Sequence, residues 1–166
     1  MKSHNPDAGE ASPQWISEMC KELSNKESFY NKWIIAIDNV MFEKKKIRLR
    51  DTQKLAIMTI ASNKSNLLAQ VNTGEGKSFI IAALAIIRAK EFGFLDIITS
   101  SPVLAQRDGE EMKVVYEAFG LTVGHNCDEQ LEKRKLAYKA NIIYGDIPRP
   151  RIRMFGFLIF VYPQNR

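Results

Sequence analysis

The chain has few cysteines and no apolar run at its start, and both features exclude classes of protein. The two cysteines, Cys20 and Cys127, match no metal-ligand spacing and are too few for a disulfide framework. The segment 1–14 lacks the apolar run that an ordinary secretory signal peptide requires. We therefore expect a cytoplasmic protein in a reducing compartment.

Positive charge is in only modest excess over negative charge. The net charge is +5 at pH 7, with 26% charged and 45% hydrophobic residues, as in one ordinary globular domain. The excess lies mainly in two basic clusters, at 44–50 and 149–153. These clusters permit peripheral contact with an anionic membrane or with nucleic acid, but solvated basic faces explain them equally well.

Hydrophobic periodicity predicts a polar start, a helical extension, and then alternating strands and helices. Residues 1–13 are polar and predicted to be disordered. The predicted helices span 15–23, 29–41, 51–60, 79–88, 102–119 and 128–140. The predicted strands span 67–71, 94–99, 121–124 and 141–144. Because helices join the strands, the predicted fold class is α/β, with helices flanking a doubly wound parallel sheet.

Individual residues refine the predicted helices. The aromatic stripe of helix 29–41 should pack on the domain that follows, and a partner-binding face is the alternative. Asp51 is predicted to cap the start of the next helix. Gly120 is predicted as the left-handed residue that ends the helix 102–119.

A phosphate-binding loop is predicted between the strand 67–71 and the helix that follows. The loop consists of Asn72, Thr73, Gly74, Glu75, Gly76, Lys77 and Ser78. Glycines let main-chain amides approach an anion, and the helix N-terminus adds partial positive charge. Lys77 would contact the β- and γ-phosphates, and the Ser78 hydroxyl would bind the bridging Mg²⁺. The loop therefore predicts binding of ATP, or a close relative, with Mg²⁺.

The loop departs at one position from the pattern Gly-x-x-x-x-Gly-Lys-Ser/Thr. Its first position is Val71 rather than glycine. The shorter form Gly-x-Gly-Lys-Ser/Thr resembles that of helicase-type motors. A chance match on a surface turn is the alternative, which the flanking strand and helix disfavour.

Four sequence blocks carry a resemblance to one family. They span residues 71–78, 96–108, 119–124 and 137–145. Their order and spacing resemble the start of the SecA preprotein translocase motor, over roughly residues 47–147. The resemblance implies a RecA-like, DEAD-box-helicase-like domain that hydrolyses ATP to push unfolded polypeptide through a membrane channel. Its implied partners are ATP, a polypeptide substrate and membrane-associated translocation machinery.

The resemblance also implies roles for particular residues. Gln53 corresponds to the glutamine that contacts the adenine edge, and Gly74 to Ser78 correspond to the phosphate loop. The amide of Gln53 has the donor and the acceptor that adenine requires. This signal is not specific, because any polar residue on an exposed helix face looks similar. Arg107 and Asp108 fall in the block that, in such motors, couples the nucleotide state to the polypeptide or nucleic acid that the motor moves along. They could equally form an ion pair on the surface of a helix.

The resemblance stops after residue 147. We expect a disordered tail (1–13), a helical extension (14–46), a partial SecA DEAD-like ATP-binding domain (47–147) and a divergent tail (148–166). No acidic magnesium-binding segment, arginine finger or second motor lobe is identified, and phosphoryl transfer in such motors depends on these parts. We therefore expect a truncated motor with little hydrolysis by itself, and the enzyme assignment stays open.

The divergent tail contains the apolar stretch 154–162. This stretch is much shorter than the ~20 residues that a transmembrane helix requires, so no transmembrane segment is predicted. It could be an edge strand, an interfacial anchor with a basic flank, or the product of a truncated or shifted reading frame.

Two other functions are compatible with the sequence. A nucleic-acid-binding helicase-like fragment would explain the pI of about 9.2. However, no interleaved aromatic and basic platform for base stacking is present, which disfavours nucleic acid as a partner. A non-catalytic interaction module that docks through the helix 29–41 is the other alternative.

Overall fold

The computed structural model describes residues 26–63, 67–72, 74–128, 130–146 and 157–160. The helices that it describes are α2 (Lys26–Lys45), α3 (Asp51–Ser62), α4 (Lys77–Phe92), α5 (Pro102–Ala118) and α6 (Leu131–Ala137). The strands are β1 (Leu95–Thr99), β2 (Val123–His125), β3 (Ile142–Asp146) and β4 (Phe157–Phe160).

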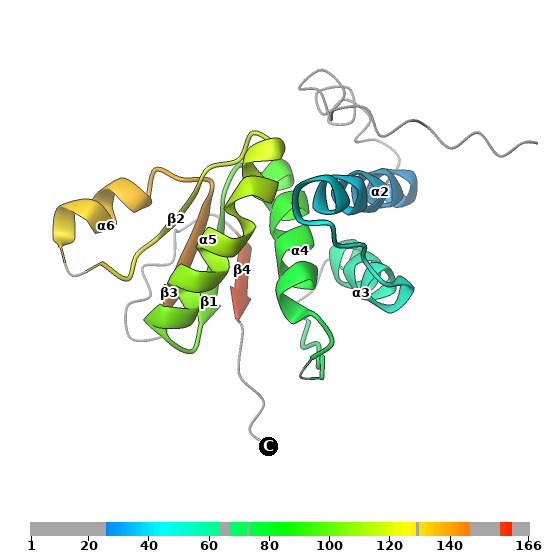
Figure 1. Ribbon diagram of the computed structural model, residues 1–166, viewed down its shortest axis with the longest axis horizontal. Coiled ribbons are helices and arrows are strands. Elements are labelled where there is room, and N and C mark those ends of the chain that lie inside the picture. Colours follow the sequence, from blue (N-terminus) through cyan, green and yellow to red (C-terminus); the bar gives the residue numbers. More distant parts are fainter. Residues whose placement is uncertain (1–25, 64–66, 73, 129, 147–156, 161–166) are drawn as a thin grey trace, which may run out of the picture.

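The strands form one parallel sheet in the order β2-β3-β1-β4. The register places Leu95 of β1 beside Ile142 of β3 and beside Phe157 of β4. Figure 1 shows α4 between the sheet and the pair formed by α2 and α3. The predicted α/β class with a parallel sheet is confirmed, as expected for part of a RecA-like domain.

The loop before α4 lies at the edge of the sheet where the strands end. In Figure 1 the start of α4 lies at the lower side of the molecule, and the β4 arrow points to the same side. Helix α5 begins on the same side, directly after β1. Ligands of open parallel sheets bind beyond the carboxyl ends of the strands, so the fold places the loop at the edge where a ligand is expected.

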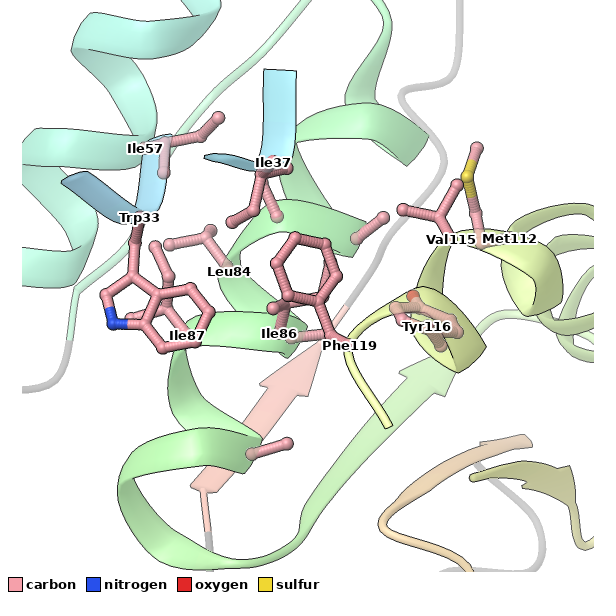
Figure 2. Close-up of a cluster of buried hydrophobic side chains, with 14 of the residues drawn as sticks. Trp33, Ile37, Ile57, Leu84, Ile86, Ile87, Met112, Val115, Tyr116 and Phe119 are labelled. Carbon is pink, nitrogen blue, oxygen red and sulfur yellow. The ribbon is translucent and has the colours of Figure 1, made fainter. Parts of the chain in front are cut away.

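Helix α2 belongs to the hydrophobic core. Trp33, Ile37 and Met41 lie on one face of the helix, and each is 0% exposed. Figure 2 shows Trp33 and Ile37 directed toward side chains of α4 and toward Phe119. The ring centroids of Trp33 and Phe119 are 5.8 Å apart. The predicted packing of the aromatic stripe on the domain is confirmed. The same face is therefore not available to a partner in this structure.

Polar contacts also fix α2 and α3 to α4. The Tyr30 hydroxyl of α2 donates to Glu91 of α4 at 2.8 Å. Arg88, buried on α4, donates to the carbonyl oxygen of Ala61 at 2.9 Å, at the end of α3. Such a cation stabilises a helix end because the last carbonyl groups of a helix lack partners within it.

One predicted strand is wrong. Residues 67–72 are described without regular secondary structure, and Leu68 is 97% exposed. A strand requires hydrogen-bonding partners along its edge. Strand β1 already has β3 on one side and β4 on the other, so no position beside β1 is left for residues 67–71.

Other boundaries shift by smaller amounts. Asp51 is the first residue of α3 rather than its cap, because Arg50 holds the N-cap position in an extended conformation. Helix α6 is shorter than predicted, while Gly120 has the predicted left-handed conformation with φ of 65°. The predicted helix 15–23 and the predicted disordered tail 1–13 lie outside the described residues.

The apolar stretch in the divergent tail contains β4, which pairs with β1 at the edge of the sheet. This is the edge-strand alternative. None of the helices in the described part of the chain is long and apolar enough to cross a membrane.

Candidate nucleotide-binding site

Two left-handed glycines shape the loop that precedes α4. Gly74 has φ of 86° and Gly76 has φ of 73°, which are values that other residues rarely adopt. The amide of Glu75 donates to the carbonyl oxygen of Asn72 at 3.2 Å and closes a turn. Gly76 then caps α4, which begins at Lys77. The loop thus leads directly into a helix N-terminus, where main-chain amides without helical partners favour an anion.

The side chain of Lys77 lies over its own loop. Its ammonium group donates to the carbonyl oxygen of Val71 at 3.1 Å. This contact joins the two ends of the loop and gives the ammonium one acceptor. Because an ammonium group has three donors, Lys77 can also bind a phosphate oxygen in reach of the loop.

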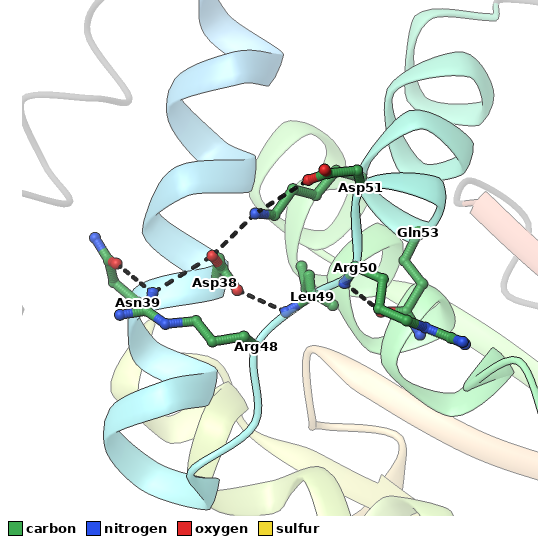
Figure 3. Close-up of polar contacts among 8 residues, drawn as sticks. Asp38, Asn39, Arg48, Leu49, Arg50, Asp51 and Gln53 are labelled. Atoms are coloured by element: carbon green, nitrogen blue, oxygen red, sulfur yellow. Dashed lines mark hydrogen bonds and ion pairs between the residues drawn. The ribbon is translucent and has the colours of Figure 1, made fainter.

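Gln53 connects the start of α3 to the loop. It is 5% exposed, its Nε2 donates to the carbonyl oxygen of Glu75 at 2.9 Å, and its Oε1 accepts from the amide of Arg50 at 2.9 Å. Figure 3 shows the contact between Arg50 and Gln53 at the beginning of α3. The structure therefore brings together Gln53 and the loop, two parts that the sequence assigned to one site. The predicted contact with adenine stays a prediction.

Arg50 is a site residue that the sequence did not indicate. Its Nη2 lies 2.8 Å from Oε2 of Glu75, and both side chains are about half exposed, at 52% and 49%. No spacing rule connects these two positions, so only the fold reveals the ion pair.

The remaining residues of the predicted site are placed as follows. Ser78 is the second residue of α4 and is partly buried, whereas Thr73 lies outside the described residues. Within the described ranges, no group of three or more histidine, cysteine, aspartate or glutamate side chains could hold a metal ion. The predicted role of Ser78 as a Mg²⁺ ligand stays a prediction.

Asp146 lies outside the predicted set of loop residues, and the sequence offers it only as an alternative holder of metal and water. It ends β3 and pairs in register with Thr99, at the carboxyl edge of the sheet. Asp146 is 3% exposed, and its Oδ1 has no hydrogen-bond partner among the residues that the structure describes. The expected coupling residues Arg107 and Asp108 form an exposed ion pair of 2.6 Å on α5.

Comparison with known proteins identifies the family. The family model of the SecA DEAD-like domain matches residues 10–149. The chain belongs to this family. The match includes the loop, α3 with Gln53, and all strands but β4.

Curated relatives agree with this assignment. The SecA protein translocase subunit of Legionella pneumophila (strain Corby) is 40% identical over 79 residues, which are 47% of this chain and 9% of the relative. That of Acidobacterium capsulatum is 36% identical over 98 residues, 57% of this chain and 9% of the relative. That of Cupriavidus metallidurans is 34% identical over 101 residues, 60% of this chain and 10% of the relative. The chain thus spans about a tenth of these SecA proteins.

Proposed function

We propose that this chain is an ATP-binding part of a SecA-type protein translocation motor. One observation carries the proposal: two left-handed glycines lead into the N-terminus of α4 at the carboxyl edge of the sheet, with Lys77 at the first helical position. This arrangement of amides, helix dipole and lysine is chemically suited to a polyphosphate. The family membership supports the nucleotide being ATP.

The residues of the loop fit this ligand. Apart from its chain neighbours, no atom of the described residues would lie within 4 Å of a Cβ at Gly74, so there is free space on that side of the loop. Lys77 would hold the terminal phosphates, and Ser78 would hold Mg²⁺ together with them. The bound Mg²⁺ would neutralise charge on the phosphates. Gln53 would keep Glu75 and Gly76 in place and offer its remaining donor and acceptor to the adenine edge.

We further propose that this chain alone hydrolyses ATP little. The loop groups contact the nucleotide in its ground state and its transition state alike, and uniform binding of this kind does not raise the rate of the chemical step. An acidic magnesium ligand and an arginine finger act on the transition state, and neither is identified in the sequence. A polypeptide substrate and membrane-associated translocation machinery are the proposed partners of the complete motor.

Equilibrium binding of a fluorescent ATP analogue tests the nucleotide proposal. Lys77→Ala should weaken binding at least tenfold, because it removes the phosphate-contacting charge; an order-of-magnitude loss is roughly 1.4 kcal/mol. Lys90→Ala is the matched control, because Lys90 lies in the last turn of the same helix. Equal affinity in the natural chain and Lys77→Ala would overturn the proposal.

A further inference from the structure

Glu75 places a negative charge inside the loop that is proposed to bind a polyphosphate. It lies between Gly74 and Gly76, and its side chain is 49% exposed. A carboxylate so close to the loop amides repels an anionic ligand, and the repulsion decreases only slowly over a few ångströms in a partly solvated site. The loop therefore contains a charge that opposes its proposed ligand.

Arg50 neutralises this charge in the structure. Its guanidinium lies 2.8 Å from the Glu75 carboxylate. The main chain of Arg50 is held by Gln53, which also donates to the carbonyl oxygen of Glu75. The start of α3 thus contacts both the main chain and the side chain of Glu75. This double contact fixes the arginine beside the loop.

We propose that Arg50 is a positioning residue of the phosphate loop that acts as the counter-charge of Glu75 and so permits a polyphosphate to bind. The inference rests on the proposed nucleotide function and adds a residue and a charge relationship to it. Arg50 acts through Glu75 and is not assigned a contact with the nucleotide.

A counter-charge role for Arg50 and a purely structural role of the ion pair predict different effects of substitution on nucleotide binding. Without Arg50, the carboxylate of Glu75 is unopposed, so Arg50→Gln should weaken nucleotide binding. Without Glu75, no repulsive charge remains, so Glu75→Gln should bind as tightly as the natural chain or more tightly. If the ion pair only held the loop in shape, either substitution would instead weaken nucleotide binding.

The experiment measures the Kd of fluorescent ATP and ADP analogues for Arg50→Gln, Glu75→Gln and the double variant, at low and at high salt. Arg50→Gln should raise the Kd of the ATP analogue roughly threefold to tenfold at low salt, more than that of ADP, and high salt should reduce the effect. The double variant should bind like the natural chain. The thermal midpoint of each ligand-free variant verifies folding.

Arg48→Gln is the matched control. Arg48 is also an exposed arginine beside α3, but it pairs with Asp38 at 3.4 Å and with Asn39 rather than with the loop. Figure 3 shows its side chain directed toward α2. Arg48→Gln should leave the Kd unchanged, which separates the pairing with Glu75 from a general loss of positive charge.

Three outcomes would overturn the inference: an unchanged Kd in Arg50→Gln, equal weakening by Arg50→Gln and Glu75→Gln, or equal weakening by Arg50→Gln and Arg48→Gln. Lys77→Ala distinguishes these failures from failure of the nucleotide function. If Lys77→Ala loses binding while Arg50→Gln retains it, only the counter-charge is wrong. If Lys77→Ala binds as the natural chain does, the proposed function itself fails.

Discussion

Gln53 donates a hydrogen bond from Nε2 to the carbonyl oxygen of Glu75, 22 residues further along the chain and 2.9 Å away. This contact joins the first turn of α3 to the loop before α4. Because Gln53 is buried and also accepts from the amide of Arg50, its amide group is fixed in orientation. The position of the loop therefore depends on a side chain outside it.

Substitution of Gln53 tests this dependence. Gln53→Glu keeps the acceptor for the Arg50 amide but places an oxygen opposite the carbonyl of Glu75. The lost bond and the buried repulsion should reduce the free energy of unfolding by about 1–3 kcal/mol. Chemical denaturation measures this change, with Asn31→Asp as a control on an exposed position. A stability equal to that of the natural chain would show that the contact does not hold the loop.

Gln53→Ala separates the loop role from the predicted adenine role. If Gln53 acts only through the loop, the variant should lose affinity for ATP and for inorganic triphosphate by the same factor. If Gln53 also contacts the adenine edge, ATP should lose more, because inorganic triphosphate has no base. We expect the second result, measured as two Kd values by competition with the fluorescent analogue. Equal factors would remove adenine from the role of Gln53.

Gly76 is the loop position that should tolerate a side chain least. A Cβ there would collide with Nε2 of Gln53 and lie 3.1 Å from the Phe79 ring, and the φ of 73° is strained for alanine. Gly74→Ala is a matched control, because its φ is 86° but no atom of the described residues, chain neighbours apart, lies within 4 Å of the added Cβ. Gly74→Ala should cost about 1–2 kcal/mol from backbone strain alone, and Gly76→Ala should cost more. Equal losses in thermal unfolding would contradict the crowding at Gly76.

Asp38 connects α2 to the segment before α3. Its Oδ1 accepts from the buried amide of Leu49 at 2.7 Å, and its Oδ2 lies 3.3 Å from Lys54 (Figure 3). Asp38→Asn keeps the acceptor for the Leu49 amide but replaces Oδ2 with an amide nitrogen, so the partly exposed ion pairs to Arg48 and Lys54 are lost at a cost under about 1 kcal/mol. Asp38→Ala leaves the amide without a partner and should cost about 1–3 kcal/mol. If urea denaturation gives both variants the same loss, the ion pairs rather than the hydrogen bond are decisive.

The sequence predicted best those elements whose signal is local. The apolar run of α4, the buried strands β1 and β3, and the loop glycines each depend on neighbouring residues, and all have the predicted form. The strand 67–71 was wrong because a strand is decided by its partners, and β4 holds the second side of β1. The pair of Arg50 and Glu75 could not be predicted, since it arises only when α3 packs beside α4.

Nucleotide binding and hydrolysis should separate in this chain. With Mg²⁺ and ATP, the chain by itself should release phosphate near the background rate and still be stabilised by the nucleotide. Ground-state contacts from Lys77, Ser78 and the loop amides lower the energy of substrate and transition state together, so they give binding without rate. At a ligand concentration a hundred times Kd, the added stability should be about 2.7 kcal/mol if the unfolded chain does not bind.

That stabilisation should appear as a rise of roughly 5–10 °C in the thermal midpoint, absent in Lys77→Ala. Calorimetry with and without ATP measures the shift, and a phosphate-release assay measures turnover on the same preparation. Robust turnover that disappears in Lys77→Ala would contradict the prediction. Glu75 or the buried carboxylate of Asp146 would then be the residues to test as holders of Mg²⁺ and water, because both carboxylates lie at the carboxyl edge of the sheet or in the loop beside it.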